Sequence, residues 1–122
     1  MNLFQNSAFI LSSGMQSNFK IECDVLTDDD WQTLAVIISN NFKFSQVIGV
    51  PTGGIKLANK LCDFCSHGPI LVVDDVLTTG RHMEEVRANL DRCGKDYIGV
   101  VVFSRGKCPD WITPIFQSMV RL

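Results

Sequence analysis

Short apolar runs alternate along the chain with segments in which apolar residues recur every three or four positions. Residues 47–50, 70–73 and 98–103 form continuous apolar runs that have the length of buried strands. Residues 55–61 and 83–93 repeat apolar side chains at helical spacing instead. This alternation predicts an α/β fold, in which helices flank both faces of a mostly parallel sheet.

An earlier helix has the clearest start signal. Thr27 precedes three aspartates at residues 28–30. A threonine hydroxyl caps the free amides of a helix start, and carboxylates in the first turn offset the positive helix end. We expect its buried face to contain the apolar residues that follow at helical spacing: Trp31, Leu34, Ala35 and Ile38.

The same spacing predicts which residues of the two later helices face the core. In the helix at 55–61 the predicted inward residues are Ile55, Ala58 and either Leu61 or Cys62. In the helix that follows residue 80 they are Met83, Val86, Leu90 and Cys93. Gly94 is expected to end that helix, because glycine is the common residue just past a helix end.

The remaining segments are shorter and more irregular. Residues 8–12 and 19–23 have an extended pattern and predict a small antiparallel element. Residues 104–110 are rich in turn formers and predict a loop. Residues 111–116 form an apolar tail segment that Pro114 interrupts.

Composition narrows the class of protein. The 122 residues predict a single domain, 1–122, and the 46% hydrophobic content is globular. Eleven basic and thirteen acidic residues give a net charge of −2, which argues against a nucleic-acid surface. No apolar run approaches the ~18 residues of a membrane span. Five cysteines, an odd number, and no export signal predict a reducing, cytoplasmic location.

Two of the cysteines form a CxxC pair, Cys62 and Cys65. A closed zinc site needs four ligands, and here only His67 is placed to add a third. A redox pair would stand at a helix start after a strand, whereas these residues follow a predicted helix. The pair is therefore interpreted mainly as two small residues near a helix end. The other three are interpreted as core or surface thiols: Cys23, Cys93 and Cys108.

Residues 70–80, with the sequence ILVVDDVLTTG, carry the strongest chemical signal. Asp74 and Asp75 follow the buried strand, and ligands of parallel sheets bind beyond the carboxyl ends of strands. Carboxylates accept hydrogen bonds from sugar hydroxyls or hold a hydrated Mg²⁺ ion. Residues 76–80 are interpreted as a loop before a helix, and three of them offer donors to a phosphate: Thr78, Thr79 and Gly80. The segment predicts a site for a sugar phosphate.

A second glycine loop precedes this motif, in GVPTGGIKLA at residues 49–58. A diphosphate needs backbone N–H donors that side chains do not obstruct, and Gly53 and Gly54 provide such a backbone. The loop is not a nucleotide-hydrolysing P-loop, because Ile55 stands where that motif needs lysine.

Both segments resemble type I phosphoribosyltransferases, most strongly over residues 47–81. The resemblance implies a Rossmann-like sheet with a small hood from the N- and C-terminal segments. It implies that Asp74 and Asp75 bind the ribose hydroxyls of 5-phosphoribosyl-1-pyrophosphate (PRPP) and influence Mg²⁺ through water. It assigns the 5′-phosphate to Leu77, Thr78, Thr79, Gly80 and Arg81. It assigns the pyrophosphate to Thr52, Gly53 and Gly54. Members often carry a basic or aromatic residue where Thr52 stands, and Lys56 is the nearest cation here.

The ends of the chain resemble orotate phosphoribosyltransferases. FILSSGMQSNFKIECD looks like the start of those enzymes, which would place Ser12 and Ser13 in the hood over the base, although members often have lysine at position 12. Arg105 looks like the arginine that grips the base, or it is an exposed loop residue. Trp111 and Phe116 either close the hood over the base or belong to the core.

The largest departure from the family is a short connection. Only residues 55–69 separate Gly54 from Ile70, and a helix and a turn use all fifteen, so we expect no strand and no mobile lid there. The resemblance implies a Mg²⁺-dependent, dimeric enzyme of nucleotide metabolism that transfers phosphoribose from PRPP to a nucleobase such as orotate. The alternatives are a regulator that binds PRPP or a nucleotide without catalysis, and a hydrolase of phosphoribosyl compounds.

Overall fold

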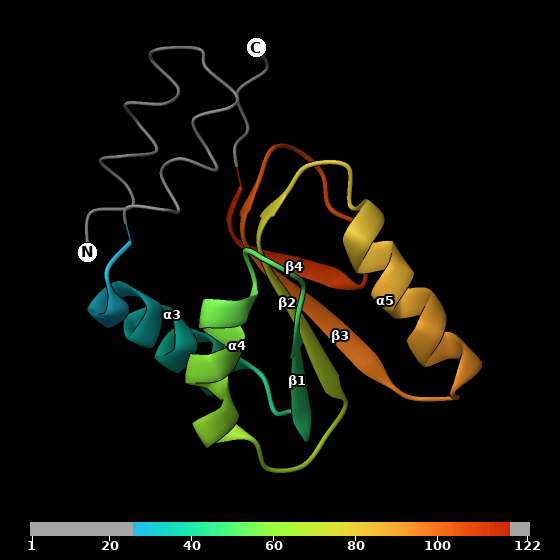
Figure 1. Cartoon of the computed structure of the whole chain (residues 1–122), viewed down its shortest axis with the longest axis horizontal. Helices are drawn as coiled ribbons and strands as arrows, with labels where there is room; N and C mark the ends of the chain where they lie inside the picture. Colours follow the sequence, from blue (N-terminus) through green and yellow to red (C-terminus); the bar gives the residue numbers. More distant parts are fainter. Residues whose placement is uncertain (1–25, 118–122) are drawn as a thin grey trace.

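The computed structural model describes residues 26–117. It contains one parallel four-stranded sheet, in the order β1-β2-β3-β4, flanked by helices (Figure 1). The strands are β1 (Gln46–Gly49), β2 (Ile70–Leu77), β3 (Tyr97–Ser104) and β4 (Ile112–Gln117). The helices are α3 (Asp28–Asn41), α4 (Ile55–Leu61), the short 3₁₀ helix η1 (Cys62–Phe64) and α5 (Arg81–Arg92). The predicted parallel α/β architecture is confirmed. The predicted elements at 8–12 and 19–23 lie outside the described residues.

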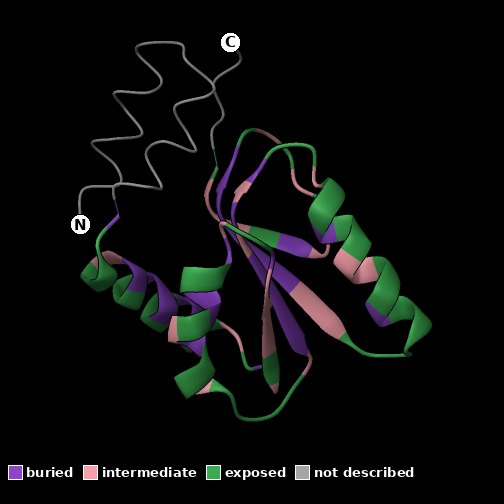
Figure 2. Ribbon diagram, in the orientation of Figure 1, coloured by how far each residue is buried: buried purple, intermediate pink, exposed green. Residues whose placement is uncertain are grey.

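The two faces of the sheet have separate cores. Leu71 and Val73 of β2 pack with α3 and α4, whereas Ile70 and Val72 pack with α5. This division follows the alternation of side chains along a strand. The buried residues accordingly run along the two central strands and along the inner sides of the helices (Figure 2).

Helix α3 begins and packs as its sequence predicts. The Thr27 hydroxyl accepts a hydrogen bond from the Asp30 N–H at 3.1 Å, and the Asp30 carboxylate accepts one from the Thr27 N–H at 3.1 Å. This reciprocal pair is a capping box. The buried residues of α3 are the four predicted ones: Trp31, Leu34, Ala35 and Ile38.

The predicted inward faces of the other helices need correction. Helix α4 buries Leu57, Ala58 and Leu61, whereas Ile55 is 39% exposed and Cys62 is exposed. Seven residues make fewer than two turns, so spacing alone leaves the direction of the buried face open. In α5, Met83 and Leu90 are buried and Val86 is half-buried, but Cys93 is exposed because the helix ends at Arg92. Gly94 has φ +66°, which fits the predicted helix end.

Two strands extend further than their sequences predicted. Strand β2 continues through both aspartates to Leu77, so the loop before α5 shortens to residues 78–80. Residues 112–117 form β4 at one edge of the sheet, although residues 111–116 were interpreted as an apolar tail. Pro114 misled that interpretation: proline lacks the N–H of an inner strand but is tolerated on an edge.

The two connections that flank β2 have opposite hands. Both step in the same direction across the sheet, from β1 to β2 and from β2 to β3. Their helices nevertheless lie on opposite faces, α4 on one and α5 on the other (Figure 1). One of the two crossovers is therefore left-handed, whereas about 98% of parallel crossovers are right-handed. As a consequence, the loops that follow β1 and β2 leave the sheet in opposite directions.

Candidate functional site at the β1–β2 junction

The diverging loops define the place where a ligand would meet the sheet. In parallel α/β sheets, ligands bind outside the carboxyl ends of neighbouring strands whose loops turn to opposite faces. Here the loop at 51–54 leads to α4 and the loop at 78–80 leads to α5. We call the residues gathered at these two strand ends the junction site: Gly53, Gly54, Asp74, Asp75, Thr78, Thr79 and Gly80.

Asp75 and Gly53 form the closest contact of the junction site. A Cβ atom on Gly53 would lie 2.3 Å from Oδ1 and 2.4 Å from Oδ2 of Asp75, so only glycine fits. The Asp75 carboxylate is 7% exposed, and its Oδ1 accepts a hydrogen bond from the Val76 N–H at 2.7 Å. Burying a carboxylate is costly unless it is hydrogen-bonded or paired, so its placement against a bare backbone loop is unusual for a purely structural aspartate.

The glycine loop itself is a tight turn. The Gly54 N–H donates to the Val50 carbonyl at 2.8 Å, and the Val50 N–H donates to the Val73 carbonyl of β2 at 2.9 Å. The peptide bond between Pro51 and Thr52 is cis. These bonds anchor both ends of the loop to the sheet and leave Thr52 exposed between them. The structure thus brings the predicted pyrophosphate loop next to the predicted ribose-binding acids.

Asp74 lies on the other side of β2, toward the start of α5. Its Oδ1 accepts a hydrogen bond from the Asp75 N–H at 2.8 Å. It lines a shallow hollow that opens to solvent. The other residues that line this hollow are Val76, Leu77, Thr78, Thr79, Gly80, Arg81, His82 and Met83. All five residues predicted to surround a 5′-phosphate therefore share one hollow.

The loop around this hollow is suited to an anion. Gly80 has φ +77°, a left-handed conformation that glycine adopts without strain, and its carbonyl accepts the Glu84 N–H at 2.9 Å. Thr79 Oγ1 accepts the Arg81 N–H at 3.3 Å. Thr78 and Thr79 are exposed, and the positive end of the 12-residue helix α5 faces the same hollow.

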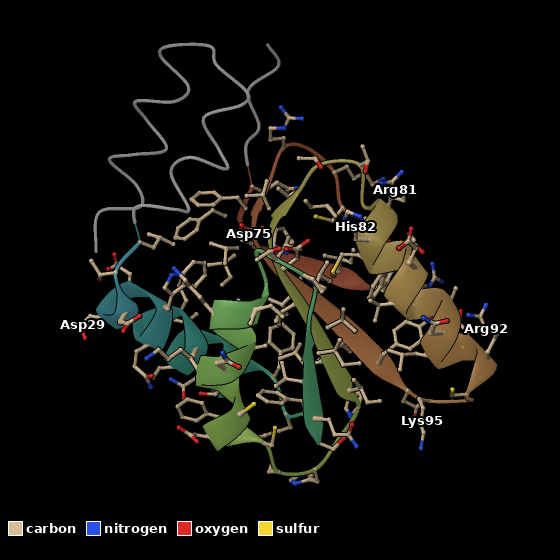
Figure 3. The ribbon with its side chains drawn as sticks, in the orientation of Figure 1. Asp29, Asp75, Arg81, His82, Arg92 and Lys95 are labelled. Atoms are coloured by element: carbon tan, nitrogen blue, oxygen red, sulfur yellow. The ribbon has the colours of Figure 1, made fainter. Side chains whose placement is uncertain are left out.

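His82 follows the predicted phosphate loop in the sequence, where nothing assigned it a role. His82 lines the hollow beside Arg81, at the amino end of α5 (Figure 3). In the same view, Asp75 lies on the other side of the strand ends from Arg81 and His82 (Figure 3). The place of His82 in the sequence offered a usable signal. His82 is the second residue of α5, and residues in the first turn of a helix lie around the same end of its axis as the loop that precedes it.

Arg105 lies just beyond the carboxyl end of the neighbouring strand β3. It follows β3, whose last residue, Ser104, pairs with Leu77 at the end of β2. Ser104 Oγ and the Gln117 side chain both donate hydrogen bonds to the Gly106 carbonyl, which ties the start of this loop to β4. Arg105 is exposed, and its role in gripping a base stays a prediction.

Trp111 and Phe116 belong to the body of the fold. The Trp111 ring packs edge-on against Tyr97 at 5.4 Å near the start of β3, away from the carboxyl ends of the strands. The Phe116 ring stacks on Phe103 at 5.5 Å. These contacts favour the core alternative over the hood alternative for both side chains. Ser12 and Ser13 lie outside the described residues.

The CxxC pair follows α4, as predicted. Cys62 begins η1, Cys65 follows η1, and both thiols are free and exposed. Partial desolvation and the neighbouring Cys62 raise the pKa of the Cys65 thiol, which is opposite to the shift of a reactive thiolate. Within residues 26–117, no three histidine, cysteine or acidic side chains gather as a metal site.

Comparison with protein-family models finds no match, and comparison with curated protein sequences finds none either. No helix among residues 26–117 is long and apolar enough to cross a membrane. The geometry of the junction site is therefore the basis for inferring a function.

Proposed function

We propose that this protein binds PRPP with Mg²⁺ at the junction site and transfers its phosphoribosyl group to a nucleobase, releasing pyrophosphate. The observation that carries this proposal is the buried Asp75 carboxylate, whose Oδ1 lies 2.3 Å from the place that a Cβ atom on Gly53 would occupy. This contact lies between two loops that turn to opposite faces of the sheet. The fold alone supports many functions, so the local chemistry must decide.

The arrangement matches the shape of PRPP, a pentose with a phosphate at one end and a diphosphate at the other. Asp74 and Asp75 lie within the carboxyl-terminal half of β2 and offer acceptors to the ribose hydroxyls. The hollow at 78–80 lies on one side of them and offers hydroxyl and backbone donors to the 5′-phosphate. The loop at 52–54 lies on the other side and offers backbone donors to the diphosphate, apart from the Gly54 N–H, which donates to the Val50 carbonyl.

The donor atoms of the two aspartates fit Mg²⁺. This ion prefers oxygen ligands, keeps several waters and binds through one or two carboxylates together with substrate phosphates. Asp74 and Asp75 face opposite sides of β2, which suits contact through water better than a shared chelate. When bound, the ion would neutralise charge on the departing diphosphate.

The reaction requires no protein nucleophile. The bond between ribose C1 and the diphosphate oxygen breaks, and the oxygen keeps the electron pair. A base nitrogen forms the new bond to C1, and its proton passes to solvent. The residues of the junction site would hold the two ends of the sugar so that C1 faces the base, and positioning of this kind accounts for a large share of catalysis in such sites.

A second candidate follows from the connection between β1 and β2. Residues 55–69 form α4, η1 and a turn, and all of them pack beside the sheet or lead into β2. A lid excludes water from a reacting centre. Access of water to C1 favours hydrolysis of PRPP, and binding without reaction favours a regulator.

The test is incubation of the full chain with PRPP, Mg²⁺ and a panel of nucleobases while pyrophosphate and base are both measured. Transfer predicts pyrophosphate release together with consumption of one base. Pyrophosphate released without base consumption supports the hydrolase, and saturable PRPP binding without release supports the regulator. Absence of binding overturns all three. Asp63→Asn, an exposed acid on η1, is the matched control for Asp75→Asn.

A further inference from the structure

The CxxC pair, Cys62 and Cys65, takes no part in the junction site. The junction site lies at the carboxyl ends of β1 and β2, where the loop at 51–54 leads into α4. The CxxC pair lies at the other end of α4, and the residues that follow it lead to the amino end of β2 (Figure 1). A role for these two thiols would therefore be separate from PRPP binding.

The backbone brings the two thiols to the same side of one helical turn. Cys62 begins η1, and the Cys65 N–H donates to the Cys62 carbonyl at 3.3 Å. Side chains three residues apart in a 3₁₀ helix lie above one another, about 6 Å apart along the axis. Cys65 keeps a helical φ of −63°, so its Cβ continues this alignment. After partial desolvation, the neighbouring Cys62 is the second cause that raises the pKa of the Cys65 thiol, as expected for sulfurs close enough to repel when ionised.

The turn that carries the pair is anchored on both sides. Leu61 is fully buried, and the Phe64 side chain packs against the core that contains α3 and α4. After the turn, the Ser66 N–H donates to the Phe44 carbonyl at 2.8 Å. Both thiols are nevertheless exposed. The result is an accessible pair of sulfur atoms on a backbone that is already held in place, so little ordering is needed to bind a ligand.

The position of the pair on its helix favours a cation over reactive thiolates. A CxxC pair at a helix start has its thiolates stabilised by the positive helix end, which makes them reactive. Cys62 and Cys65 lie at the opposite, negative end, where cations are stabilised. Residues 61–69 add one acid, Asp63, and contain neither lysine nor arginine. The charges at this end of α4 therefore attract a positive ion.

We propose that Cys62 and Cys65 bind one Cu(I) ion through their two sulfur atoms. Thiolates are soft ligands and select soft ions such as Cu(I). Cu(I) accepts linear coordination by two ligands, whereas a closed Zn²⁺ site needs four. Within residues 26–117, no third histidine, cysteine or acidic side chain gathers with the pair. On binding, each thiol loses its proton to solvent and each sulfur donates an electron pair to the ion, whose oxidation state does not change.

The test is a titration of the reduced full chain with Cu(I) under nitrogen, in competition with a coloured Cu(I) chelator. The reference is a chain that keeps only the pair, with Cys23, Cys93 and Cys108 changed to serine, and we expect it to bind one Cu(I) ion. Adding Cys62→Ser or Cys65→Ser should lower the affinity by more than about a hundredfold, the upper end of the cost of losing an outer-shell partner of a metal ligand. Circular dichroism checks that each variant folds.

A matched control keeps two thiols but changes their spacing. Cys65→Ser combined with Ser66→Cys moves one thiol off the shared side of the turn, and both positions are exposed. We expect this shifted pair to bind Cu(I) as weakly as the variants with one thiol. Equal affinity of the shifted pair and the original pair would overturn the inference, because any two nearby thiols would then suffice.

A second measurement needs no variant. In the ¹⁵N-labelled wild-type chain, one equivalent of Cu(I) should shift the backbone amide signals of Cys62 and Cys65 and leave that of the exposed Cys93 unchanged. Shifts at Cys93 alone, no binding by the folded reference chain, or one ion shared between two chains would each overturn the site. PRPP is absent from all of these experiments, so their outcome is independent of the proposed function.

Discussion

The two sides of helix α5 use polar groups in different ways. On the side of β3 and β4, Glu84, Arg87 and Trp111 contact one another. The Trp111 Nε1–H donates to Glu84 at 3.1 Å, Arg87 pairs with Glu84 at 3.2 Å, and its guanidinium lies 5.6 Å from the Trp111 ring centre. Hydrogen bonds to Tyr97 and Glu84 raise the pKa of Arg87. At the amino end of α5, by contrast, two threonines and the Asp74 carboxylate line a hollow.

The difference separates a structural network from a binding site. In the network, each side chain satisfies another, and the result ties α5 to the start of β3 and the approach to β4. In the junction site, the Asp74 and Asp75 carboxylates each accept a hydrogen bond from the backbone amide of the next residue. For the buried Asp75, a backbone partner of this kind holds the carboxylate in place, and a carboxylate has two oxygens with which to accept further hydrogen bonds.

The largest effect is expected from the double variant Asp74→Asn with Asp75→Asn. Each carboxylate hydrogen bond to a ribose hydroxyl is worth about 1.5–3 kcal/mol, so PRPP affinity should fall about a thousandfold. Titration calorimetry measures the affinity, and thermal unfolding checks that the fold persists. An affinity equal to that of the Asp63→Asn control would remove both acids from the site.

The next effect concerns Gly53→Ala. The new Cβ would lie 2.3 Å from Asp75 Oδ1, so the carboxylate must move and PRPP binding should fall. Overpacking of this kind costs about 1–3 kcal/mol of unfolding free energy. Gly94→Ala is the matched control: its φ of +66° costs about 1–2 kcal/mol, yet nothing lies within 4 Å and binding should be unchanged. Equal binding by the two variants would refute the special role of Gly53.

A smaller effect is expected in the structural network, from Trp111→Phe. This change removes the hydrogen bond to Glu84 and weakens the cation–π contact. The free energy of unfolding should fall by about 1 kcal/mol, measured by urea denaturation. PRPP affinity should stay within about twofold of the wild-type value, which is the usual error of an affinity measurement. A larger loss would show that the network positions the phosphate hollow, and would erase the distinction between the two sides of α5.

The smallest effect concerns Cys65, which belongs to neither region. Because its pKa is raised, a smaller fraction of Cys65 than of an ordinary exposed cysteine is thiolate near pH 8. Alkylation followed by mass spectrometry should show Cys65 reacting more slowly than exposed Cys93. The difference should shrink as the pH rises through the raised pKa. Faster reaction at Cys65 would revive a redox role for the CxxC pair.

Much of this fold could be predicted because local signals agree with tertiary packing. The Thr27 cap, the four buried residues of α3 and the Gly94 helix end are local, and each is confirmed. The direction of α4 and the strand character of residues 112–117 depend on neighbours far away in the sequence. Ile55 is exposed because α4 turns another face to the sheet, and Pro114 is tolerated because β4 lies at an edge.

The composition of the candidate site was predictable, but its arrangement was not. The sequence identified both aspartates and both loops. It did not reveal that the acids lie within β2, that they face opposite sides, or that Asp75 touches Gly53. That His82 lines the hollow could not be predicted, because the hollow forms only when β2 and α5 are placed together.

The most direct test of the central claim is a residue-resolved titration of the ¹⁵N-labelled chain with PRPP and Mg²⁺ by nuclear magnetic resonance. We predict saturable shifts of the backbone amides of Gly53, Asp75, Thr79 and Gly80, all with one dissociation constant, and little change at Trp111. Saturable shifts confined to other parts of the chain, or none at these four amides, would contradict the account.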